Sequence, residues 1–437
     1  MQKYTGDIEP NKELLKNYIN KVIGNSENEK KIVERINSIL IYEKQMNKNK
    51  KLFTEKTLYI NRPIKFGEYI IYINTITENN SMFPYILVYP KALKENSELV
   101  VDTLNTRSGH NTEDRIDVLL RGLDEVGLVI KCKINVPMAY VFVPRREFST
   151  EPYYQQLSRE CFVSDNIKYN RCDLLVKASI INAQNKIQNI SGKNISDKIV
   201  LEGYSTSGVF AQRFALLHPE MISKAIIGGA IGSIPIPTQD FNYPIGIKDF
   251  KQIFGEYFNE EAYKNIQFAY YAGELEEKTK STRKDENGNQ LPMHDMSYLK
   301  KSIPEDIAKE YREVFGINLN DRFRNVIDWY KKNDYKIISK IYKDANHTDL
   351  RSSKYKYIKN HFEDLMSFYT DGINGNGFKA DKSSSEKIEI FNNKKAGYED
   401  CINDKNLRIS IEQEANKKIK QNIIENNNIL EQNEQQK

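Results

Sequence analysis

The stretch KIVLEGYSTSGVFAQRFALLHP, residues 198–219, decides the fold of this chain. A short apolar segment, residues 199–201, is followed by the small-residue run GYSTSG and then by apolar residues at positions i, i+4 and i+7. The pattern predicts a strand, a tight turn and a helix, and the helix ends before Pro219 because proline does not allow it to continue. A serine, Ser205, lies at the corner between strand and helix.

A strand, a tight turn and a helix in this order are what a nucleophile elbow requires. Gly203 lets the two backbones approach, and Ser207 and Gly208 keep the other side of the turn small. Ser205 can therefore adopt a strained conformation with its hydroxyl exposed. The N–H of Thr206, at the start of the helix, would point at a negative oxygen developing beside Ser205. We expect Ser205 to be a nucleophile; the alternative is a plain Ser/Gly turn.

Other apolar segments predict strands and helices on both sides of this elbow. Short apolar strands separated by helical segments are typical of a parallel sheet that is covered on both faces. Ser205 follows the fifth expected strand. The expected strands are an antiparallel pair at residues 66–77 and 85–89, then residues 99–101, 139–143, 199–201, 225–228, 268–271 and 337–342.

The elbow with the RFALLHPE that follows it, and three further segments, carry a family resemblance: YPKALKENSELVVDTLNTRSG, YYQQLSRECF and YPIGIKD. They resemble a little-described set of bacterial α/β-hydrolase-like proteins that stand loosely near esterases and polyhydroxyalkanoate depolymerases. The resemblance covers residues 60–368. It implies the α/β class and the α/β-hydrolase fold, with a mostly parallel central sheet, helices on both faces and lid-like insertions. The elbow departs from the family's G-x-S-x-G, because Ser207 holds the second glycine position and the glycine follows at 208.

Composition divides the chain into three parts. Residues 1–59 are expected to be an N-terminal helical extension, and residues 60–368 the catalytic domain. Residues 369–437 are rich in Gly, Asn, Ser, Lys, Glu and Gln, which predicts a polar, disordered tail. Inside the domain, the Pro- and aromatic-rich residues 229–264 are either a lid or a loop packed on the body. Residues 278–334 are expected to be a surface insertion with helices.

A serine hydroxyl needs a base within hydrogen-bond reach and a third group that holds the base. In the α/β-hydrolase fold these groups follow each other as serine, acid and histidine. Among the five histidines, His347 alone follows the last expected strand at once, so we expect it to be the general base; otherwise it is a solvated loop histidine. His218 follows Ser205 too soon and is expected to be structural. His294 falls in the polar insertion and His361 in the last helix.

The acid should follow the strand that ends at residue 271. There the chain reads AGELEE, residues 272–277, which resembles the family's G-x-x-D and places Glu276 at the acid position. Glu274 is the alternative. These glutamates could instead form only a charged loop, with the acid elsewhere, for example at Asp321 or Asp349.

Stabilising an oxyanion requires a second donor besides the N–H of Thr206. The family takes it from the loop after the third strand. The backbone N–H of Asn105 or Thr106 is the candidate here. Arg107 and His110 lie close by in the sequence and could contact the substrate. The alternative is that each is only a polar loop residue.

Composition argues against several other classes of protein. The four cysteines form no C-x-x-C pair, so neither a zinc site nor a disulfide framework is indicated, and a reducing compartment is expected. The net charge of +5 is spread along the chain, which argues against nucleic acid as a partner. No apolar signal segment or 18-residue apolar run occurs, so we expect a cytoplasmic protein without a membrane span. Motifs for nucleotide, zinc and dinucleotide binding are absent from the sequence.

These features predict a serine hydrolase that cleaves a small-molecule or lipid-like acyl ester through an acyl-enzyme, with no metal or organic cofactor. A catalytically inactive hydrolase-fold protein that binds a ligand or partner is the alternative from another class. A peptidase or an acyltransferase would use the same three residues. The sequence carries no signal of oligomeric state.

Overall fold

The computed structural model describes residues 61–378 except residues 62, 75–81, 105–121, 128, 131–132, 145–151, 165–168, 170, 279, 285–289, 293–302, 348–349 and 351–358. The expected helical extension at residues 1–59 and residues 379–437 of the expected tail lie outside the described residues. Residues 369–378, which were expected to belong to the disordered tail, are described: they include the end of a helix (Lys359–Asp371), a 3-10 turn (Gly372–Asn374) and the buried Phe378. So do these residues that the sequence singled out: Asn105, Thr106, Arg107, His110, His294 and Asp349.

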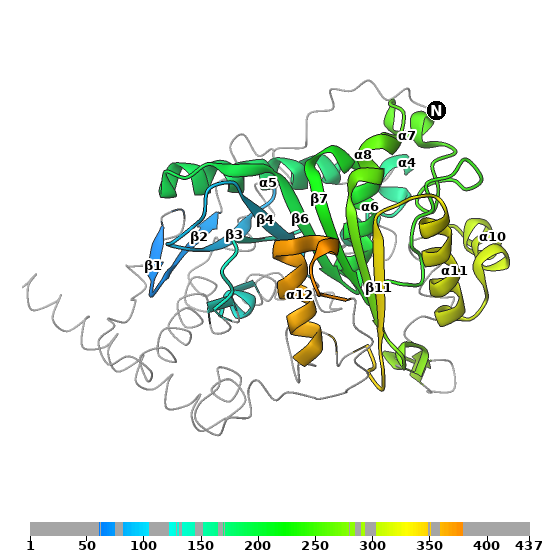
Figure 1. The fold of residues 1–437 in the computed structure, drawn as a ribbon. Coiled ribbons are helices and arrows are strands. Elements are labelled where there is room, and N and C mark those ends of the chain that lie inside the picture. The colour runs from blue at the N-terminus through cyan, green and yellow to red at the C-terminus, as the bar shows by residue number, and fades with distance from the viewer. Residues whose placement is uncertain are drawn as a thin grey trace, which may run out of the picture.

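A nine-stranded sheet forms the centre of the described body, in the order β1-β2-β3-β5-β4-β6-β7-β8-β11 (Figure 1). From β5 to β11 all neighbours are parallel, whereas β3 runs antiparallel to both β2 and β5. The predicted α/β class with a mostly parallel sheet is confirmed. The strands are β1 (Ile64–Phe66), β2 (Tyr69–Asn74), β3 (Tyr85–Pro90), β4 (Ser97–Asp102), β5 (Met138–Val141), β6 (Ile195–Tyr204), β7 (Ile222–Gly228), β8 (Gln267–Gly273) and β11 (Ile337–Tyr342).

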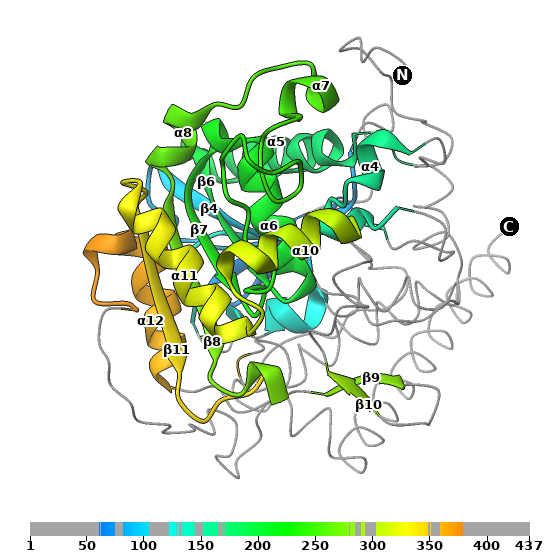
Figure 2. The same ribbon diagram turned by 90° about the vertical axis from the view of Figure 1, so that its right-hand side faces the viewer.

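Two helical layers cover the sheet, which is why its parallel strands read as continuous apolar runs rather than as alternating patterns. Helices α5, α6, α10 and α11 pack on one face, and α12 packs on the other (Figures 1 and 2). The helices are α4 (Glu160–Val163), α5 (Cys172–Ser191), α6 (Thr206–Leu217), α7 (Phe250–Phe254), α8 (Glu260–Asn265), α10 (Glu305–Phe315), α11 (Leu319–Lys332) and α12 (Lys359–Asp371). Short 3-10 turns are η3 (Tyr154–Gln156), η4 (Pro219–Met221), η5 (Glu276–Lys278) and η6 (Gly372–Asn374).

The N-terminal hairpin differs from the single strand expected at residues 66–77. The chain forms β1, turns at Gly67 and returns as β2, so the strand expected to begin at residue 66 begins at Tyr69. Gly67 has a φ of 52°, a conformation that costs glycine little because it has no Cβ. The antiparallel pairing of β2 with β3 is as predicted.

The insertion after β8 contains a hairpin that the sequence did not predict. It consists of β9 (Lys280–Lys284) and β10 (Gln290–Pro292). Its first strand reads KSTRK, which lacks the apolar residues from which strands are recognised. The helices expected within residues 278–334 are present as α10 and α11.

Residues 229–264 pack against α10 and α11. Three buried side chains of these helices bind carbonyl oxygens of the segment: Tyr311 Oη donates to Ile234 (2.9 Å), Arg322 Nε to Gly232 (3.2 Å) and Tyr330 Oη to Pro235 (2.6 Å). The segment following β7 is therefore fixed to the body by side chains that lie more than 70 positions away in the chain.

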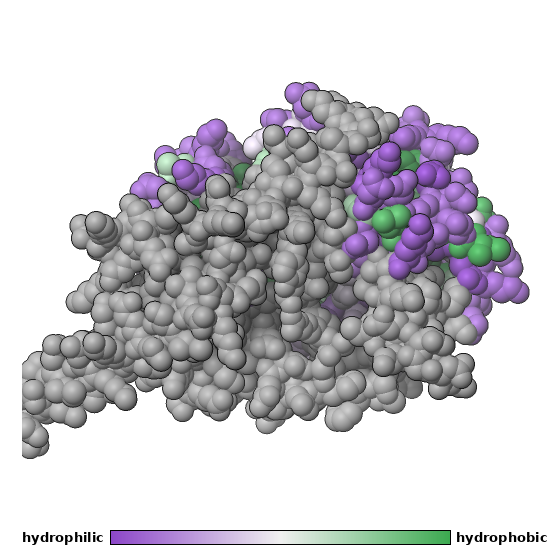
Figure 3. Space-filling view, turned by 90° about the horizontal axis from the view of Figure 1, so that it is seen from below, coloured by the Kyte–Doolittle hydropathy of each residue, from purple (hydrophilic) through white to green (hydrophobic). Residues whose placement is uncertain are grey.

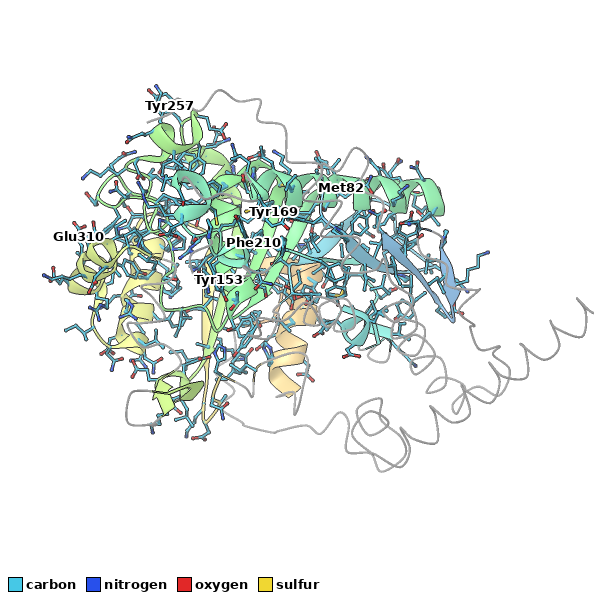
Figure 4. All side chains as sticks on the ribbon, turned by 180° about the vertical axis from the view of Figure 1, so that it is seen from behind. Met82, Tyr153, Tyr169, Phe210, Tyr257 and Glu310 are labelled. Atoms are coloured by element: carbon cyan, nitrogen blue, oxygen red, sulfur yellow. The ribbon has the colours of Figure 1, made fainter. Side chains whose placement is uncertain are left out.

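The described surface is polar with scattered apolar residues. In Figure 4, Phe210 lies inside the body, whereas Tyr257 and Glu310 lie at its outer edge. Figure 3 shows hydrophobic residues only in small separate groups among hydrophilic ones on the described part of that face. Exposed apolar residues of this kind are normal for a folded protein and indicate no binding surface by themselves.

Candidate active site

Ser205 occupies a strained corner between β6 and α6. Its φ of 59° and ψ of −115° lie outside the regions that a non-glycine residue usually adopts. The N–H of Ser205 donates to the carbonyl of Gly228 (2.8 Å), and its carbonyl accepts from the N–H of Val209 (2.9 Å). Main-chain bonds to β7 and α6 therefore fix this conformation, and the side chain is left only half-buried.

Small residues around the corner are required by close backbone contacts. A Cβ atom at Gly203 would lie 2.3 Å from the carbonyl oxygen of Ser207, and one at Gly208 would lie 2.9 Å from Gly228 O and from Ala230 Cβ. The second of these contacts explains the departure from G-x-S-x-G, because it is Gly208 that faces the neighbouring strand.

Ser207, at the second glycine position of the motif, has its own role in the turn. Its Oγ accepts the N–H of Tyr204 (2.9 Å) and donates to the carbonyl of the same residue (3.2 Å). The hydroxyl therefore closes the turn from inside, and serine is accommodated where the motif has glycine.

Thr206 is the first residue of α6 and is half-buried beside Ser205. N–H groups of the first helical turn have no acceptor within the helix, and the helix dipole favours negative charge there. The other oxyanion candidates, Asn105 and Thr106, lie outside the described residues. Strand β4, which precedes them in the chain, ends at the same edge of the sheet as β6, because the two strands are parallel and Asp102 pairs with Glu202.

His347 and Glu276 form a buried pair. His347 Nδ1 lies 2.7 Å from Glu276 Oε2, and the two side chains are 5% and 0% exposed. The other carboxylate oxygen of Glu276 accepts the N–H of Gly273 (3.3 Å). Both residues follow neighbouring parallel strands, β8 and β11, whose last residues Gly273 and Tyr342 are paired.

Backbone contacts hold the two loops together. The N–H of Leu275 donates to the carbonyl of Ala345 (2.8 Å), and the N–H of Glu274 donates to that of Tyr342 (2.9 Å). A Cβ atom at Gly273 would lie 2.3 Å from the Ala345 oxygen, so only glycine allows this approach. The pairing of acid and imidazole therefore follows from the path of the main chain.

The alternative acids point elsewhere. Glu274 is exposed, and its Oε2 accepts the N–H of Asp344 (3.0 Å). Asp321 is exposed on α11, where it lies 3.5 Å from Arg324. Among the described candidates, the structure brings Glu276 to His347 and does not bring Glu274 or Asp321 to it.

The imidazole of His347 reaches the elbow through Tyr204, the residue directly before Ser205. Tyr204 Oη donates to the carbonyl of His347 (2.5 Å), and the two rings are 5.0 Å apart. Gly229 lies against both rings: a Cβ there would be 2.7 Å from Tyr204 Cζ and 2.8 Å from His347 Cε1. Sequence reasoning missed Tyr204 and Gly229, and only their positions beside the elbow and after β7 could have suggested them.

A carboxyl group on β6 lies close to the elbow. Burial raises the pKa of Glu202 to about 8, and the nearby Asp102 raises it further, while the hydrogen bond from Tyr369 Oη (2.5 Å) opposes the shift. The raised pKa favours the neutral form of this carboxyl, which lies on the strand that leads to Ser205.

The other described histidines lie in different environments. His218 Nε2 is 2.9 Å from Asp173 Oδ2 at the end of α6. His361 Nδ1 on α12 is 3.3 Å from Tyr342 Oη, and burial lowers the pKa of His361 to about 4. Neither is brought to Ser205 by any contact described above.

The described residues show neither a metal-binding cluster nor a membrane-spanning helix. In the ranges given above, no group of three or more His, Cys, Asp or Glu side chains is arranged to hold a metal ion. None of the helices in this part of the chain combines the length and the apolar character needed to cross a membrane.

The strand order and the corner together decide the fold. A strained serine lies at a strand-to-helix turn on a mostly parallel sheet, and a carboxylate and an imidazole follow later strands in that chain order. This is the arrangement of one known architecture. The chain has the α/β-hydrolase fold. Glu276 and His347 follow the carboxyl ends of the parallel strands β8 and β11, and Ser205 follows that of β6.

Comparisons with known proteins find similarity only to solved structures, at low sequence identity. No family model and no curated protein matches the chain. Among solved structures, it is similar to poly(aspartic acid) hydrolase-1 from Sphingomonas sp. KT-1, with 15% identity, 61% of this chain and 88% of that chain covered, and a TM-score of 0.37. It is also similar to a poly(3-hydroxybutyrate) depolymerase from Bordetella parapertussis, with 12% identity, coverage of 70% and 89%, and a TM-score of 0.40.

Proposed function

We propose that this protein is a serine hydrolase that cleaves an ester-type acyl bond, with Ser205, His347 and Glu276 as its catalytic residues. The observation that carries the proposal is the buried pair of His347 and Glu276, 2.7 Å apart, whose imidazole packs against the residue next to Ser205. A buried imidazole held by a carboxylate beside a strained serine is what activation of a hydroxyl requires.

In the proposed reaction, His347 accepts the proton of the Ser205 hydroxyl while the oxygen attacks the carbonyl carbon of the ester. The negative oxygen that forms is stabilised by the N–H of Thr206 and by a second donor from Asn105 or Thr106. His347 then gives its proton to the leaving alcohol, and the acyl group stays on Ser205. Water, deprotonated by His347, releases the acid and restores the serine.

Glu276 holds the imidazole with Nδ1 protonated, and it stabilises the imidazolium that forms during each proton transfer. The substrate class that we propose is a small-molecule or lipid-like acyl ester. The steps above need no metal ion and no organic cofactor, because the chain supplies the nucleophile, the base and the oxyanion donors.

The test is intact-mass spectrometry after exposure to a fluorophosphonate probe. Wild type is expected to gain one adduct and Ser205→Ala none, because the phosphorus is attacked only by an activated hydroxyl. Ser223→Ala is the matched control. In the wild type, the Ser223 hydroxyl lies at the start of β7 and donates to the carbonyl of Ile199 (3.0 Å). Labelling of this variant should therefore be retained. Labelling of a folded Ser205→Ala protein would contradict the assignment of the nucleophile.

Absence of an adduct on folded wild type would favour the alternative that the fold only binds a ligand or partner. A peptidase or an acyltransferase would use the same residues and differ in the leaving group and the acyl acceptor. A labelled protein would therefore be assayed next on p-nitrophenyl esters, p-nitroanilides and esters with an added alcohol.

A further inference from the structure

Tyr204 is the last residue of β6 and directly precedes Ser205. Its side chain is buried, and its hydroxyl donates a hydrogen bond of 2.5 Å to the backbone carbonyl of His347. The bond joins residues 143 positions apart in the chain. It is therefore a direct tie between the strand that carries the serine and the loop that carries the imidazole.

The ring of Tyr204 is fixed from both sides. It stacks on Tyr271 with the ring centroids 5.9 Å apart and an interplanar angle of 26°, and it lies 5.0 Å from the His347 ring. Gly229 provides the space for this packing, since a Cβ atom there would lie 2.7 Å from Tyr204 Cζ. A ring packed in this way has no room to turn, so its hydroxyl stays directed at one acceptor.

We propose that Tyr204 is a positioning residue that sets the place of His347 relative to Ser205. This inference rests on the proposed function. Glu276 holds the imidazole by Nδ1, which fixes the orientation of the ring, whereas Tyr204 holds the backbone of the same residue. Because Tyr204 and Ser205 are consecutive, the distance between base and nucleophile is set by one short segment of chain.

The hydroxyl of Tyr204 is not needed to hold the elbow itself. The main chain of Tyr204 is already held by Ser207 Oγ, and β6 is paired with β7 up to Gly228. Replacing Tyr204 by phenylalanine keeps the ring and its stacking and removes the hydroxyl that donates to His347. The variant should therefore fold with the serine in place and with a base that is less well positioned.

The experiment compares Tyr204→Phe with the control Tyr271→Phe, which removes a hydroxyl from the neighbouring buried ring. Turnover of p-nitrophenyl acetate and the rate of labelling by the fluorophosphonate probe are measured for both. Tyr204→Phe is expected to lower kcat and the labelling rate by roughly 10- to 100-fold, because a small misplacement of a reacting group has an effect of this size. KM should change little, and Tyr271→Phe should behave as wild type.

The decisive comparison is made in the background of His347→Ala. If Tyr204 acts through His347, adding Tyr204→Phe to His347→Ala should not lower the residual labelling rate further. A further loss in that background, or a Tyr204→Phe single variant that is as fast as wild type, would overturn the inference. A Tyr204→Phe protein that does not fold by circular dichroism would also overturn it, because the hydroxyl would then stabilise the body as a whole. If the probe does not label folded wild type, the proposed function itself is wrong.

Discussion

The described part of the chain contains two buried histidine–carboxylate pairs joined by a hydrogen bond, and they differ in what surrounds them. His347 Nδ1 lies 2.7 Å from Glu276, and His218 Nε2 lies 2.9 Å from Asp173. Distance and burial hardly distinguish the pairs, since all four side chains are at most 5% exposed. The contact alone therefore does not make a candidate site.

Position along α6 separates the two pairs. Ser205 precedes the first residue of α6, and His218 follows the last one, so the 12 residues of the helix place them about 18 Å apart. His218 packs against Phe214 of the same helix, with the rings 4.7 Å apart. His347 packs against Tyr204, which adjoins the serine.

The charges around the carboxylates also distinguish the two pairs. Arg171 binds both oxygens of Asp173, at 2.9 and 2.7 Å. Burial raises the pKa of the Asp173 carboxyl, but the hydrogen bonds from Arg171 and His218 outweigh it and hold the pKa below its usual range. Asp173 therefore ties the start of α5 to the end of α6, and this pair is best explained as a structural link. The pair of His347 and Glu276 at the strand ends is the one that we propose to be catalytic.

The largest expected effect comes from removing the imidazole of His347, and removal of the His218 imidazole is the comparison. His347→Ala should lower the labelling rate roughly 10⁵-fold, because a serine without its base loses most of its reactivity. His218→Ala should leave the labelling rate per folded molecule unchanged and lower the free energy of unfolding by about 1–3 kcal/mol, since Asp173 loses a buried hydrogen bond. Probe kinetics and urea denaturation measure the two quantities.

Equal losses of labelling in the two folded variants would contradict this comparison. Such a result would mean that His218 affects the elbow through α6 and that the two pairs act as one network. Far-ultraviolet circular dichroism of both variants shows whether the folded state is retained.

The second prediction tests the carboxylate that holds the base. Glu276→Gln should lower the labelling rate roughly 10⁴-fold, because an amide can hold the imidazole in the wrong tautomer and cannot stabilise the imidazolium. Glu274→Gln is the matched control two residues away, where the exposed side chain accepts only the N–H of Asp344 among its described contacts. The assignment of the acid is wrong if Glu274→Gln is the slower variant.

The sequence predicts the sheet and the elbow well because both depend on local pattern. The buried strands appear as apolar runs, and the turn at Ser205 appears as a run of small residues between a strand and a helix. His347 could be predicted because it directly follows a strand whose bounds, residues 337–342, were read correctly.

Contacts between distant segments could not be predicted in this way. Glu274 and Glu276 are two positions apart in one charged loop, and only the bonds of that loop to Ala345 and Tyr342 decide which of them faces His347. The bond of Tyr204 to His347 has no signal in the pattern at all, since an aromatic residue at the end of a strand usually packs in the core.

The smallest expected effect concerns the stability that the structural pair contributes. Asp173→Asn should leave the labelling rate unchanged and lower the free energy of unfolding at pH 7 by about 3 kcal/mol, because Arg171 and His218 lose a buried carboxylate. Glu220→Gln is the control on the same helix end: its surface pair with Lys177, at 2.9 Å, should contribute less than about 1 kcal/mol.

The pH dependence of this difference follows from the lowered pKa of Asp173. A carboxyl whose pKa is lower in the folded state contributes stability above its unfolded pKa of about 3.9, and the contribution is lost as the pH falls toward the folded-state value. The gap in urea midpoint between wild type and Asp173→Asn should therefore be constant between pH 5 and pH 7. It should narrow below about pH 4. A gap that widens on acidification would mean that the carboxyl is protonated in the folded protein, and the distinction between the two pairs would no longer hold.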